Sequence, residues 1–418
     1  MSDNKNPKTL SKRINYISEL LKGNNLKTMV NFNKTDTEYF INKKSIDSDS
    51  SYNSNNSYDT SFILDKKIHD FYKIISKIGG KLIYIKSGTS GHTFKGVFKN
   101  ENNETNSYAV KVVAYPKKEK YGDINDIRRP ENAELMMIKV LSYFVINKQT
   151  PHIILPIGTF NTSIKPFLSL IEDEVVDNDN KKYKQFIEKY KKKEYHEQVS
   201  ILMSEWANKG DLLDFIRRHY TKLTLIHWKV FLFQIISTLA VIQSKFPSFR
   251  HNDLKANNIL VHKDKNKQNI VFRYTVNNRK YIIPNIGYQI KLWDFDFACI
   301  PNIVDNKKVN AKWTTNINVI PERNRYYDIH YFFNTLIKKG FFPQFNKSKA
   351  IPEEVREFVY RIVPLKYRNE KKGVIAERGR ILIDLEYTTP NKILKHDVFF
   401  EEFRKKKKKR EKKQSISS

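Results

Sequence analysis

The stretch RHNDLKANNILV, from Arg250 to Val261, places a dense polar loop directly before a short apolar run. The polar residues from His251 to Asn258 are too closely spaced for a core element, whereas Ile259 to Val261 predicts a short buried strand. Asn and Asp often bond their own backbone, so an ordinary turn is one interpretation. A catalytic loop held against a rigid strand is the other, and the rest of the chain must decide between them.

The overall composition favours a large intracellular protein. The chain has 418 residues, which is enough for a core divided into two packed units. Its one cysteine, Cys299, excludes disulfides and thiolate zinc sites within a monomer and fits a reducing, cytoplasmic compartment. We see neither a secretory signal nor eighteen consecutive apolar residues, so we expect no transmembrane segment.

The chain is strongly basic, with a formal net charge of +31. Part of this charge lies in the tail, where RKKKKKREKK runs from Arg404 to Lys413. We expect residues 404–418 to be solvated and disordered. Such a tail could make nonspecific contact with nucleic acid or an anionic membrane, act as a targeting signal, or only keep the chain soluble.

The order of predicted elements indicates an α+β domain with two lobes. Residues 1–61 look disordered, above all the polar stretch Ser45–Ser61, although a weak helix is predicted near Lys12–Leu21. Residues 62–403 look globular, with a strand-rich lobe at about 75–207, a helical lobe at about 208–403, and insertions at about 165–197 and 262–288. The patterns predict strands at Tyr84–Val97, Ser107–Ala114, Ile153–Phe160 and Val199–Glu205, and helices at Glu131–Phe144 and Trp228–Ser244.

The strand-rich lobe contains three features that suit phosphate binding. Glycines at Gly88 and Gly91 let the backbone approach an anion closely, although an ordinary hairpin turn would also use them. Lys111 lies on an alternating strand of the same lobe, where it faces either a cleft or water. Glu134 lies at the edge of a helix stripe, where its carboxylate could hold Lys111 or simply face solvent.

Two more features lie where the lobes would meet. A buried strand ends at Glu205, and the backbone groups of Glu205 and Ala207 could bond an adenine edge. In YQIKLWDFDFACI, Asp294 and Asp296 are two residues apart at a strand end and therefore share one face. A carboxylate beside Asn258 is a plausible site for Mg²⁺, which prefers oxygen ligands.

The succession of these motifs resembles a eukaryotic-type protein kinase over about residues 75–403. The resemblance implies an α+β, two-lobed kinase fold that uses ATP and Mg²⁺. It assigns the catalytic aspartate to Asp253, charge neutralisation at the γ-phosphoryl to Lys255, and metal binding to Asn258 and Asp294. Positioning and charge neutralisation are what phosphoryl transfer requires of such groups.

The resemblance also assigns the nucleotide site. Lys111 matches the lysine that contacts the α- and β-phosphates, with Glu134 as its partner and Glu131 as the alternative partner. Ser204 falls at the gatekeeper position. The nucleotide-binding residues that it implies are Ile85, Gly88, Gly91, Thr93, Lys111, Glu134, Glu205 and Ala207.

Several residues depart from the kinase pattern. Lys86 stands in place of the first glycine of the loop, Asn252 in place of the arginine that normally reads an activation-loop phosphate, and Asp296 in place of the glycine of DFG. Pro321-Glu322 and Asp328 resemble two later kinase motifs, but their closeness predicts a shortened peptide-docking region. The DFD motif and the long hairpin before it, with its Asn-Asn turn, resemble the serine/threonine kinases of poxviruses and giant viruses. That likeness implies a host cytoplasm or virion location.

Three other interpretations remain open at this point. The HND-x4-N and DFD motifs also resemble choline and aminoglycoside kinases, although Lys255 favours a protein substrate. A pseudokinase scaffold is a second interpretation, but Lys111, Asp253, Asn258 and Asp294 are all present. A nucleic-acid-binding protein is a third, which depends on charge alone.

Overall fold

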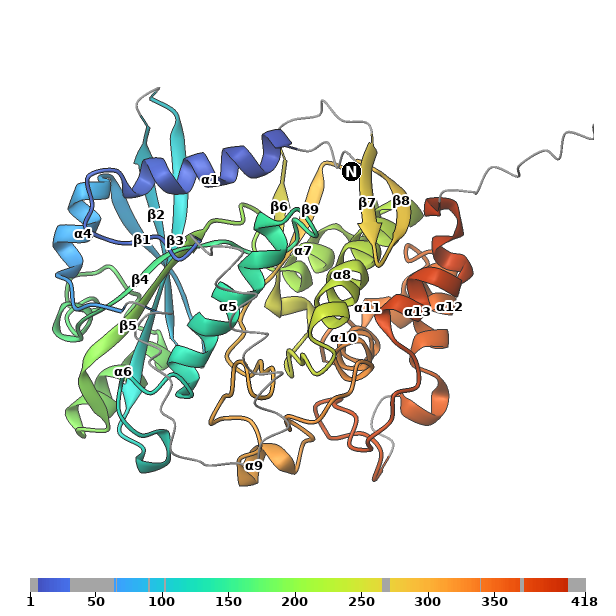
Figure 1. Ribbon diagram of the computed structural model, residues 1–418. Helices are drawn as coiled ribbons and strands as arrows, with labels where there is room; N and C mark the ends of the chain where they lie inside the picture. Colours follow the sequence, from blue (N-terminus) through green and yellow to red (C-terminus); the bar gives the residue numbers. More distant parts are fainter. Residues whose placement is uncertain are drawn as a thin grey trace, which may run out of the picture.

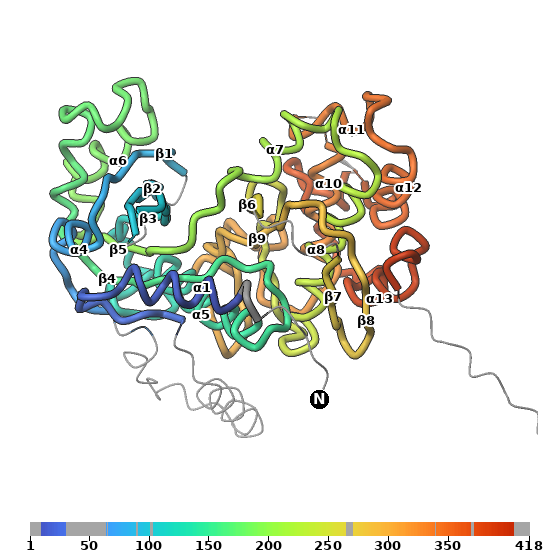
Figure 2. Tube along the Cα trace, turned by 90° about the horizontal axis from the view of Figure 1, so that it is seen from above, coloured from blue at the N-terminus to red at the C-terminus, as the bar shows by residue number. Residues whose placement is uncertain are grey.

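The computed structural model describes residues 7–30, 64, 66–88, 91–100, 103–264, 271–338, 340–368 and 372–404. It contains a sheet-based lobe followed by a helical lobe, as the sequence predicted (Figure 1). Seen from above, the two lobes lie side by side and the segment after β5 crosses from one to the other (Figure 2). The predicted disorder at residues 1–6, 31–61 and 405–418 lies outside the described residues.

The first lobe is built on a five-stranded antiparallel sheet in the order β1-β2-β3-β5-β4. Its strands alternate between the two faces, and β2 buries every second side chain, including Phe94 and Phe98. This alternation is why the sequence could predict them. The strands are β1 (Lys81–Ser87), β2 (His92–Lys99), β3 (Thr105–Pro116), β4 (Pro156–Ser163) and β5 (Tyr195–Glu205).

Helix α5 packs against this sheet and carries Glu134. It begins with Pro130, whose missing N–H costs nothing in a first turn, and it is buried over nearly its whole length. The charged insertion is ordered, because α6 buries Tyr183 and Phe186 within it. The helices of this lobe are α1 (Pro7–Leu21), α4 (Phe71–Ile78), α5 (Pro130–Ile146) and α6 (Lys181–Lys191).

The prediction of disorder must be corrected for residues 7–30. Helix α1 is longer than the predicted weak helix, and it buries Ile17 and Leu20. Leu26 and Met29 after it are buried too, and the Met29 N–H donates to the Ile157 carbonyl at 3.0 Å. The polar composition of the N-terminal segment concealed these few apolar anchors.

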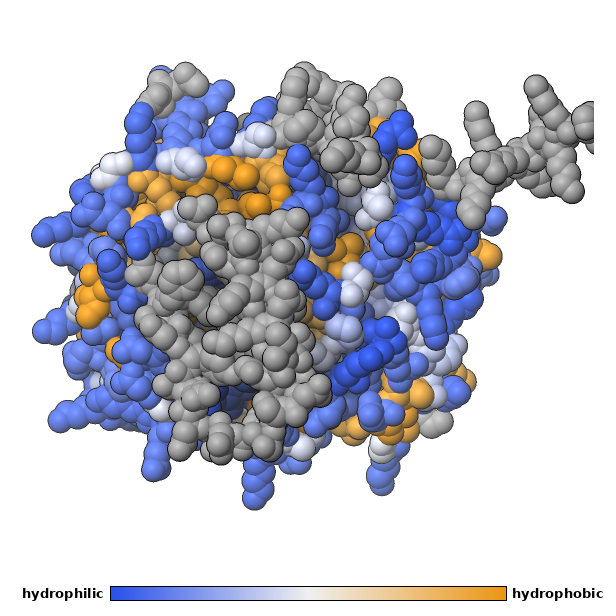
Figure 3. Space-filling view, in the orientation of Figure 1, coloured by the Kyte–Doolittle hydropathy of each residue, from blue (hydrophilic) through white to orange (hydrophobic). Residues whose placement is uncertain are grey.

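The second lobe surrounds α8 (Leu225–Lys245). Among the described residues α8 is long and apolar enough to cross a membrane, but 78% of its apolar window is buried inside the protein, as in a core helix. Of the residues coloured by hydropathy on the visible face, most are hydrophilic (Figure 3). The other helices are α7 (Leu212–His219), α9 (Lys312–Thr315), α10 (Tyr327–Ile337), α11 (Gln344–Lys347), α12 (Glu353–Ile362) and α13 (Pro390–His396).

Two small antiparallel pairs complete this lobe. Strands β6 (Ile259–Lys263) and β9 (Tyr288–Leu292) flank the insertion predicted at 262–288. Within it, β7 (Val271–Val276) and β8 (Arg279–Pro284) form the predicted hairpin. Asn277 and Asn278 form its turn with φ of 46° and 65°, the left-handed conformation that a two-residue hairpin turn needs.

Candidate active site

The polar loop that opened the sequence analysis is anchored to helix α10. The two carboxylate oxygens of Asp328 accept the N–H groups of His251 at 2.8 Å and of Asn252 at 2.9 Å. The His251 ring contacts the Trp293 carbonyl at 3.1 Å. The loop is therefore held from two sides, as a catalytic loop must be, and Asp328 has the structural position that the sequence suggested.

Asp253 lies within this loop and is surrounded by donors. Lys255 Nζ donates to Oδ2 at 2.7 Å, and Asn258 Nδ2 donates to the same oxygen at 2.8 Å. Arg380 donates to Oδ1. The Asp253 side chain is 11% exposed, so these three donors surround a nearly buried carboxylate.

The pairing of β6 with β9 explains how Asn258 and Asp294 meet. Ile259 lies opposite Leu292 in the antiparallel register, so Asn258 and Asp294 stand at the same end of the two-stranded sheet. The Trp293 N–H donates to the Asn258 carbonyl at 3.3 Å. Asp294 has φ of 63°, an uncommon conformation for a residue other than glycine that is enriched at functional sites.

Lys111 connects the two lobes at this point. Its ammonium contacts Glu134 Oε1 at 2.6 Å and Asp294 Oδ1 at 3.0 Å. Burial lowers the pKa of Lys111, but Asp294 and Glu134 outweigh it and raise the pKa above its ordinary value. Burial alone would raise the pKa of Asp294, but the positive charge of Lys111 has the larger effect and holds this pKa below its ordinary value. Lys111 and Asp294 are therefore a charged pair.

Glu134, rather than Glu131, is the partner of Lys111. Glu131 faces Arg129 instead, with Oε2 of the carboxylate 3.1 Å from Nε of the guanidinium. The sequence left both glutamates open because they lie one turn apart on the same helix.

The residues at the lobe interface suit a divalent cation bound together with a polyphosphate. Asn258 Nδ2 is held by Asp253, which leaves the amide oxygen as the atom that can bind a metal. Asp294 supplies a carboxylate, and its second oxygen is not the one that contacts Lys111. No cluster of three His, Cys, Asp or Glu that could hold a metal occurs in the described parts of the chain. Mg²⁺ typically takes one or two protein oxygens and completes its shell with phosphate and water, so the residues fit.

The glycine loop connects β1 and β2, and Gly88 and Gly91 are its described residues. The Gly88 N–H donates to the Gly91 carbonyl at 2.7 Å, which closes the turn. A Cβ on Gly91 would lie 2.4 Å from the Val112 carbonyl oxygen, so the close approach to β3 requires glycine there. Ile85 on β1 is 40% exposed, and Thr93 on β2 pairs in register with Lys111.

Lys86, the residue in place of the first glycine, reaches the other lobe. Its ammonium lies 3.6 Å from the Asp211 carboxylate at the start of α7. The Lys86 side chain is 59% exposed, so this contact contributes little free energy. It does show that the end of β1 lies close to the start of α7.

The connector at the end of β5 is only partly available to a ligand. The Glu205 N–H already donates to the Leu155 carbonyl at 3.1 Å, so its carbonyl is the backbone group that could meet an adenine. Its carboxylate binds Arg13 of α1 instead. Ser204 and Ala207 are both buried.

The acidic residue in place of the DFG glycine has its own partner. Asp296 Oδ2 lies 2.7 Å from Lys308 Nζ, and both side chains are nearly buried. Burial raises the pKa of Asp296, and Lys308 offsets this only in part. Asn252 donates through Nδ2 to the Phe297 carbonyl at 3.0 Å, so it ties the catalytic loop to the segment after the DFD motif.

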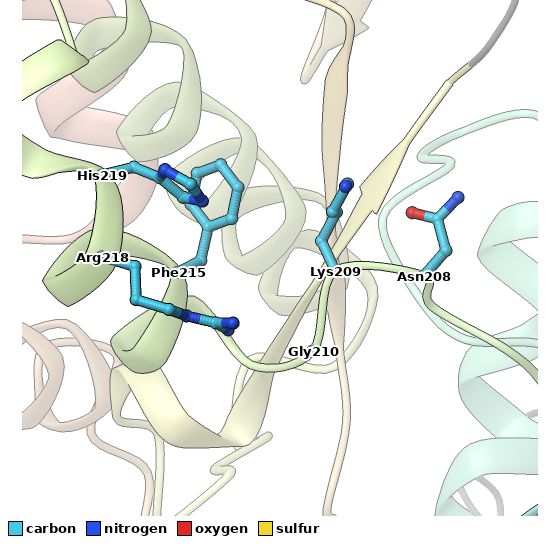
Figure 4. A pocket seen from close by; sticks show the side chains of 6 residues that line it. All are labelled: Asn208, Lys209, Gly210, Phe215, Arg218 and His219. Atoms are coloured by element: carbon cyan, nitrogen blue, oxygen red, sulfur yellow. The ribbon is translucent and has the colours of Figure 1, made fainter.

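A hollow of about 370 Å³ lies beside the connector, between residues 208–210 and α7. Figure 4 shows Lys209 and Asn208 on the connector and Arg218 and His219 on α7 around it. It is lined by none of the predicted nucleotide-binding residues. We therefore assign it no part in the chemistry.

Sequence reasoning missed two arginines at the site. Arg380 contacts Asp253 from 127 positions away, and Arg13 contacts Glu205 from 192 positions away. Neither belongs to a local motif or to an apolar periodicity. The one available signal for Arg13 was the weak helix that contains it.

The comparisons with known proteins agree with this geometry. The family model described as poxvirus serine/threonine protein kinase matches residues 121–401. A protein of Acanthamoeba polyphaga mimivirus, named as a candidate serine/threonine-protein kinase, is 48% identical over 408 residues, which cover 96% of this chain and 82% of that protein.

Poxvirus proteins match over a shorter region. Serine/threonine-protein kinase 2 of Monkeypox virus is 32% identical over 139 residues, and that of Vaccinia virus (strain Western Reserve) is 31% identical over 139 residues. In each case the match covers 32% of this chain and 28% of the poxvirus protein. These matches favour a protein kinase over the choline-kinase, pseudokinase and nucleic-acid-binding interpretations.

Proposed function

The chain belongs to the poxvirus serine/threonine protein kinase family, and we propose on this premise how its own residues carry out the transfer. It is a viral serine/threonine protein kinase that uses ATP and acts on protein substrates. In our proposal Asp253 orients the substrate hydroxyl and accepts its proton, while Lys255 neutralises charge on the transferring phosphoryl group. Lys111 holds the α- and β-phosphates.

We propose Mg²⁺ as the divalent cation, with Asn258 and Asp294 as its protein ligands. The support is the donor set, because one amide oxygen and one carboxylate suit a hard cation that keeps phosphate and water ligands. The cation would neutralise phosphate charge when the nucleotide is bound. Asn258 directly precedes β6 and Asp294 follows its partner strand β9, so the pairing of the two strands brings them together before a ligand arrives.

One observation carries the proposal: the Lys111 ammonium contacts Glu134 at 2.6 Å and Asp294 at 3.0 Å. These three residues come from three separate elements, and a kinase requires this lysine–glutamate pair and the metal-binding aspartate together. Lys255, paired with Asp253 at 2.7 Å, supports a protein hydroxyl as the acceptor.

The test is transfer of labelled γ-phosphate from ATP and Mg²⁺ to a protein mixture. We expect labelled serine and threonine with the wild-type protein and none with Asp253→Asn. Asp214→Asn is the matched control, because its side chain is 58% exposed and lies on α7. Equal labelling by the wild type and Asp253→Asn would refute the assignment, as would labelling of amino-alcohols in place of protein. Replacing Mg²⁺ with Mn²⁺ or adding a chelator tests the choice of cation.

The location and the basic tail also remain proposals. We propose that the protein acts in the host cytoplasm or the virion, because its one described cysteine, Cys299, is free and buried. We propose that residues 404–418 make nonspecific contact with nucleic acid or an anionic membrane through their charge. Salt-dependent binding that survives deletion of these residues would contradict the second proposal.

A further inference from the structure

The Asp253 carboxylate lies between two cations that approach its two oxygens separately. Lys255 contacts Oδ2 at 2.7 Å, and Arg380 contacts Oδ1. Arg380 is 127 positions further along the chain and belongs to none of the kinase motifs described above. We propose that Arg380 is a positioning residue, which fixes the Asp253 carboxylate so that one defined acceptor site faces the substrate hydroxyl. This inference rests on the proposed function.

The number of acceptor sites explains why Arg380 matters. A carboxylate has about four lone-pair sites, two on each oxygen. Lys255 and Asn258 both donate to Oδ2, at 2.7 and 2.8 Å, so that oxygen is fully used. Arg380 uses one site on Oδ1. The remaining site for a substrate hydroxyl is therefore on Oδ1, and the guanidinium sets its direction.

This arrangement fits the transfer step. The hydroxyl oxygen forms a bond to the γ-phosphorus, the bond from that phosphorus to the bridging oxygen of ADP breaks, and the hydroxyl proton passes to Oδ1. Without Arg380, both sites of Oδ1 become open and the carboxylate can rotate about its Cβ–Cγ bond. The hydroxyl would then bind in several orientations, of which only some are in line with the phosphorus.

Arg380 is itself held firmly from several sides. Its side chain is 8% exposed, and its guanidinium lies 4.4 Å from the centre of the Tyr331 ring on α10. Its Nε also donates to the Asn252 carbonyl at 3.4 Å. A planar group fixed by a ring and by two acceptors has little freedom to turn.

The turn that carries Arg380 is fixed to the same helix. The Ala376 N–H donates to the Arg380 carbonyl at 2.8 Å, and Asn334 of α10 donates to the Gly379 carbonyl at 2.8 Å. Gly379 has φ of 92°, a conformation that side chains rarely adopt. Lys338, which follows α10 directly, also donates to the Glu377 carbonyl. Helix α10 also holds the catalytic loop through Asp328, so the segments that carry Arg380 and Asp253 are attached to the same helix. This shared attachment suits a residue that positions Asp253 permanently better than one that blocks it reversibly.

The experiment compares Arg380→Met with Arg380→Lys and with Arg378→Met as the matched control. Arg378 is exposed in the same turn. With the full-length chain, labelled ATP and a protein substrate, we expect Arg380→Met to lower kcat by about 10²-fold. We expect the KM for ATP to change by less than about twofold, because the contacts of Lys111 are untouched. Arg380→Lys should recover part of kcat, and Arg378→Met should equal the wild type.

The outcomes separate this inference from the proposed function. An active wild type with an equally active or more active Arg380→Met protein would overturn the positioning role alone. A parallel rise in the KM for ATP would also overturn it, because it would indicate a general loss of structure. A wild type without transfer would overturn the proposed function and this inference with it. If Arg380→Met fails to fold by thermal melting, Arg380→Gln decides, and wild-type kcat in that folded variant would be the refuting result.

Discussion

Arg13 of helix α1 joins the N-terminal segment to the connector between the lobes, and its removal should destabilise the protein measurably. Its guanidinium donates to both carboxylate oxygens of Glu205, at 2.7 and 2.6 Å. It also donates to the carbonyls of Pro151 at 3.0 Å and Ile153 at 2.7 Å. The two side chains are 11% and 13% exposed, so this is a nearly buried bidentate pair.

The expected magnitude follows from what Arg13→Ala leaves behind. Burial raises the pKa of Glu205, and Arg13 outweighs this and holds it below its ordinary value. The variant therefore strands a buried carboxylate, and breaking such a pair costs roughly 3–5 kcal/mol. Lys291 lies close enough to Glu205 for the two charges to interact, so it offsets part of the loss. We expect a decrease of about 3 kcal/mol in the free energy of unfolding, near the lower end of that range.

Urea unfolding at neutral pH, followed by tryptophan fluorescence, measures this change. At about 2 °C per kcal/mol for a domain of this size, the melting temperature should fall by about 6 °C. The double variant Arg13→Ala/Glu205→Gln should lose less than the sum of its single variants, because it leaves no stranded charge. Lys12→Ala is the matched control, since Lys12 is exposed on the same helix. An Arg13→Ala protein within about 0.5 kcal/mol of the wild type, or additive single effects, would refute the reasoning.

Three further predictions concern the site and its surroundings. Lys111→Met should lower transfer by at least about 10²-fold while the protein stays folded, measured with labelled ATP and checked by circular dichroism; near-normal transfer would contradict the assignment. Lys308→Met should lower the free energy of unfolding in urea by about 3 kcal/mol, because it leaves the buried Asp296 carboxylate without its partner. Adding Asp296→Asn to this variant should restore part of the lost stability. If it restores none, the loss of the ion pair is not the cause. Burial lowers the pKa of His92 to about 4, so the unfolded chain binds a proton there that the native chain does not between pH 6.5 and 4. The free energy of unfolding should therefore fall as the pH drops through this window. His92→Gln should reduce the slope of unfolding free energy against pH by up to about 1.4 kcal/mol per pH unit. An unchanged slope would show that proton binding at His92 does not differ between the native and unfolded chains.

The parts of the site that could be predicted are those with local patterns. The strands around Phe94 and Phe98 alternate with a period of two, and the helix that carries Glu134 begins at Pro130, so the elements could be placed. Asp253 and Asn258 lie in one short polar loop, and the order of the motifs on either side of it indicates that they act together. Such residues are fixed by secondary structure, which a sequence records directly.

The parts that could not be predicted depend on tertiary packing. Arg380 meets Asp253 because a turn closed by Gly379 packs on α10, and that packing leaves no periodic signal near residue 380. Arg13 meets Glu205 because α1 buries Ile17 and Leu20, two apolar residues in an otherwise polar segment. In both cases a charged residue is buried by distant elements, whereas composition alone predicts that it is exposed.

Asn252 brings these contacts together in an argument about activation. An arginine at this position can pair with a phosphate on the segment after the metal-binding aspartate, but a neutral amide cannot form such an ion pair. Here the Asn252 amide nitrogen already donates to the Phe297 carbonyl at 3.0 Å. The same segment is held a second time by the Asp296–Lys308 pair at 2.7 Å. Because contacts of the unmodified chain already hold this segment, and Lys111 already meets Glu134 and Asp294, a phosphate there would have little left to order.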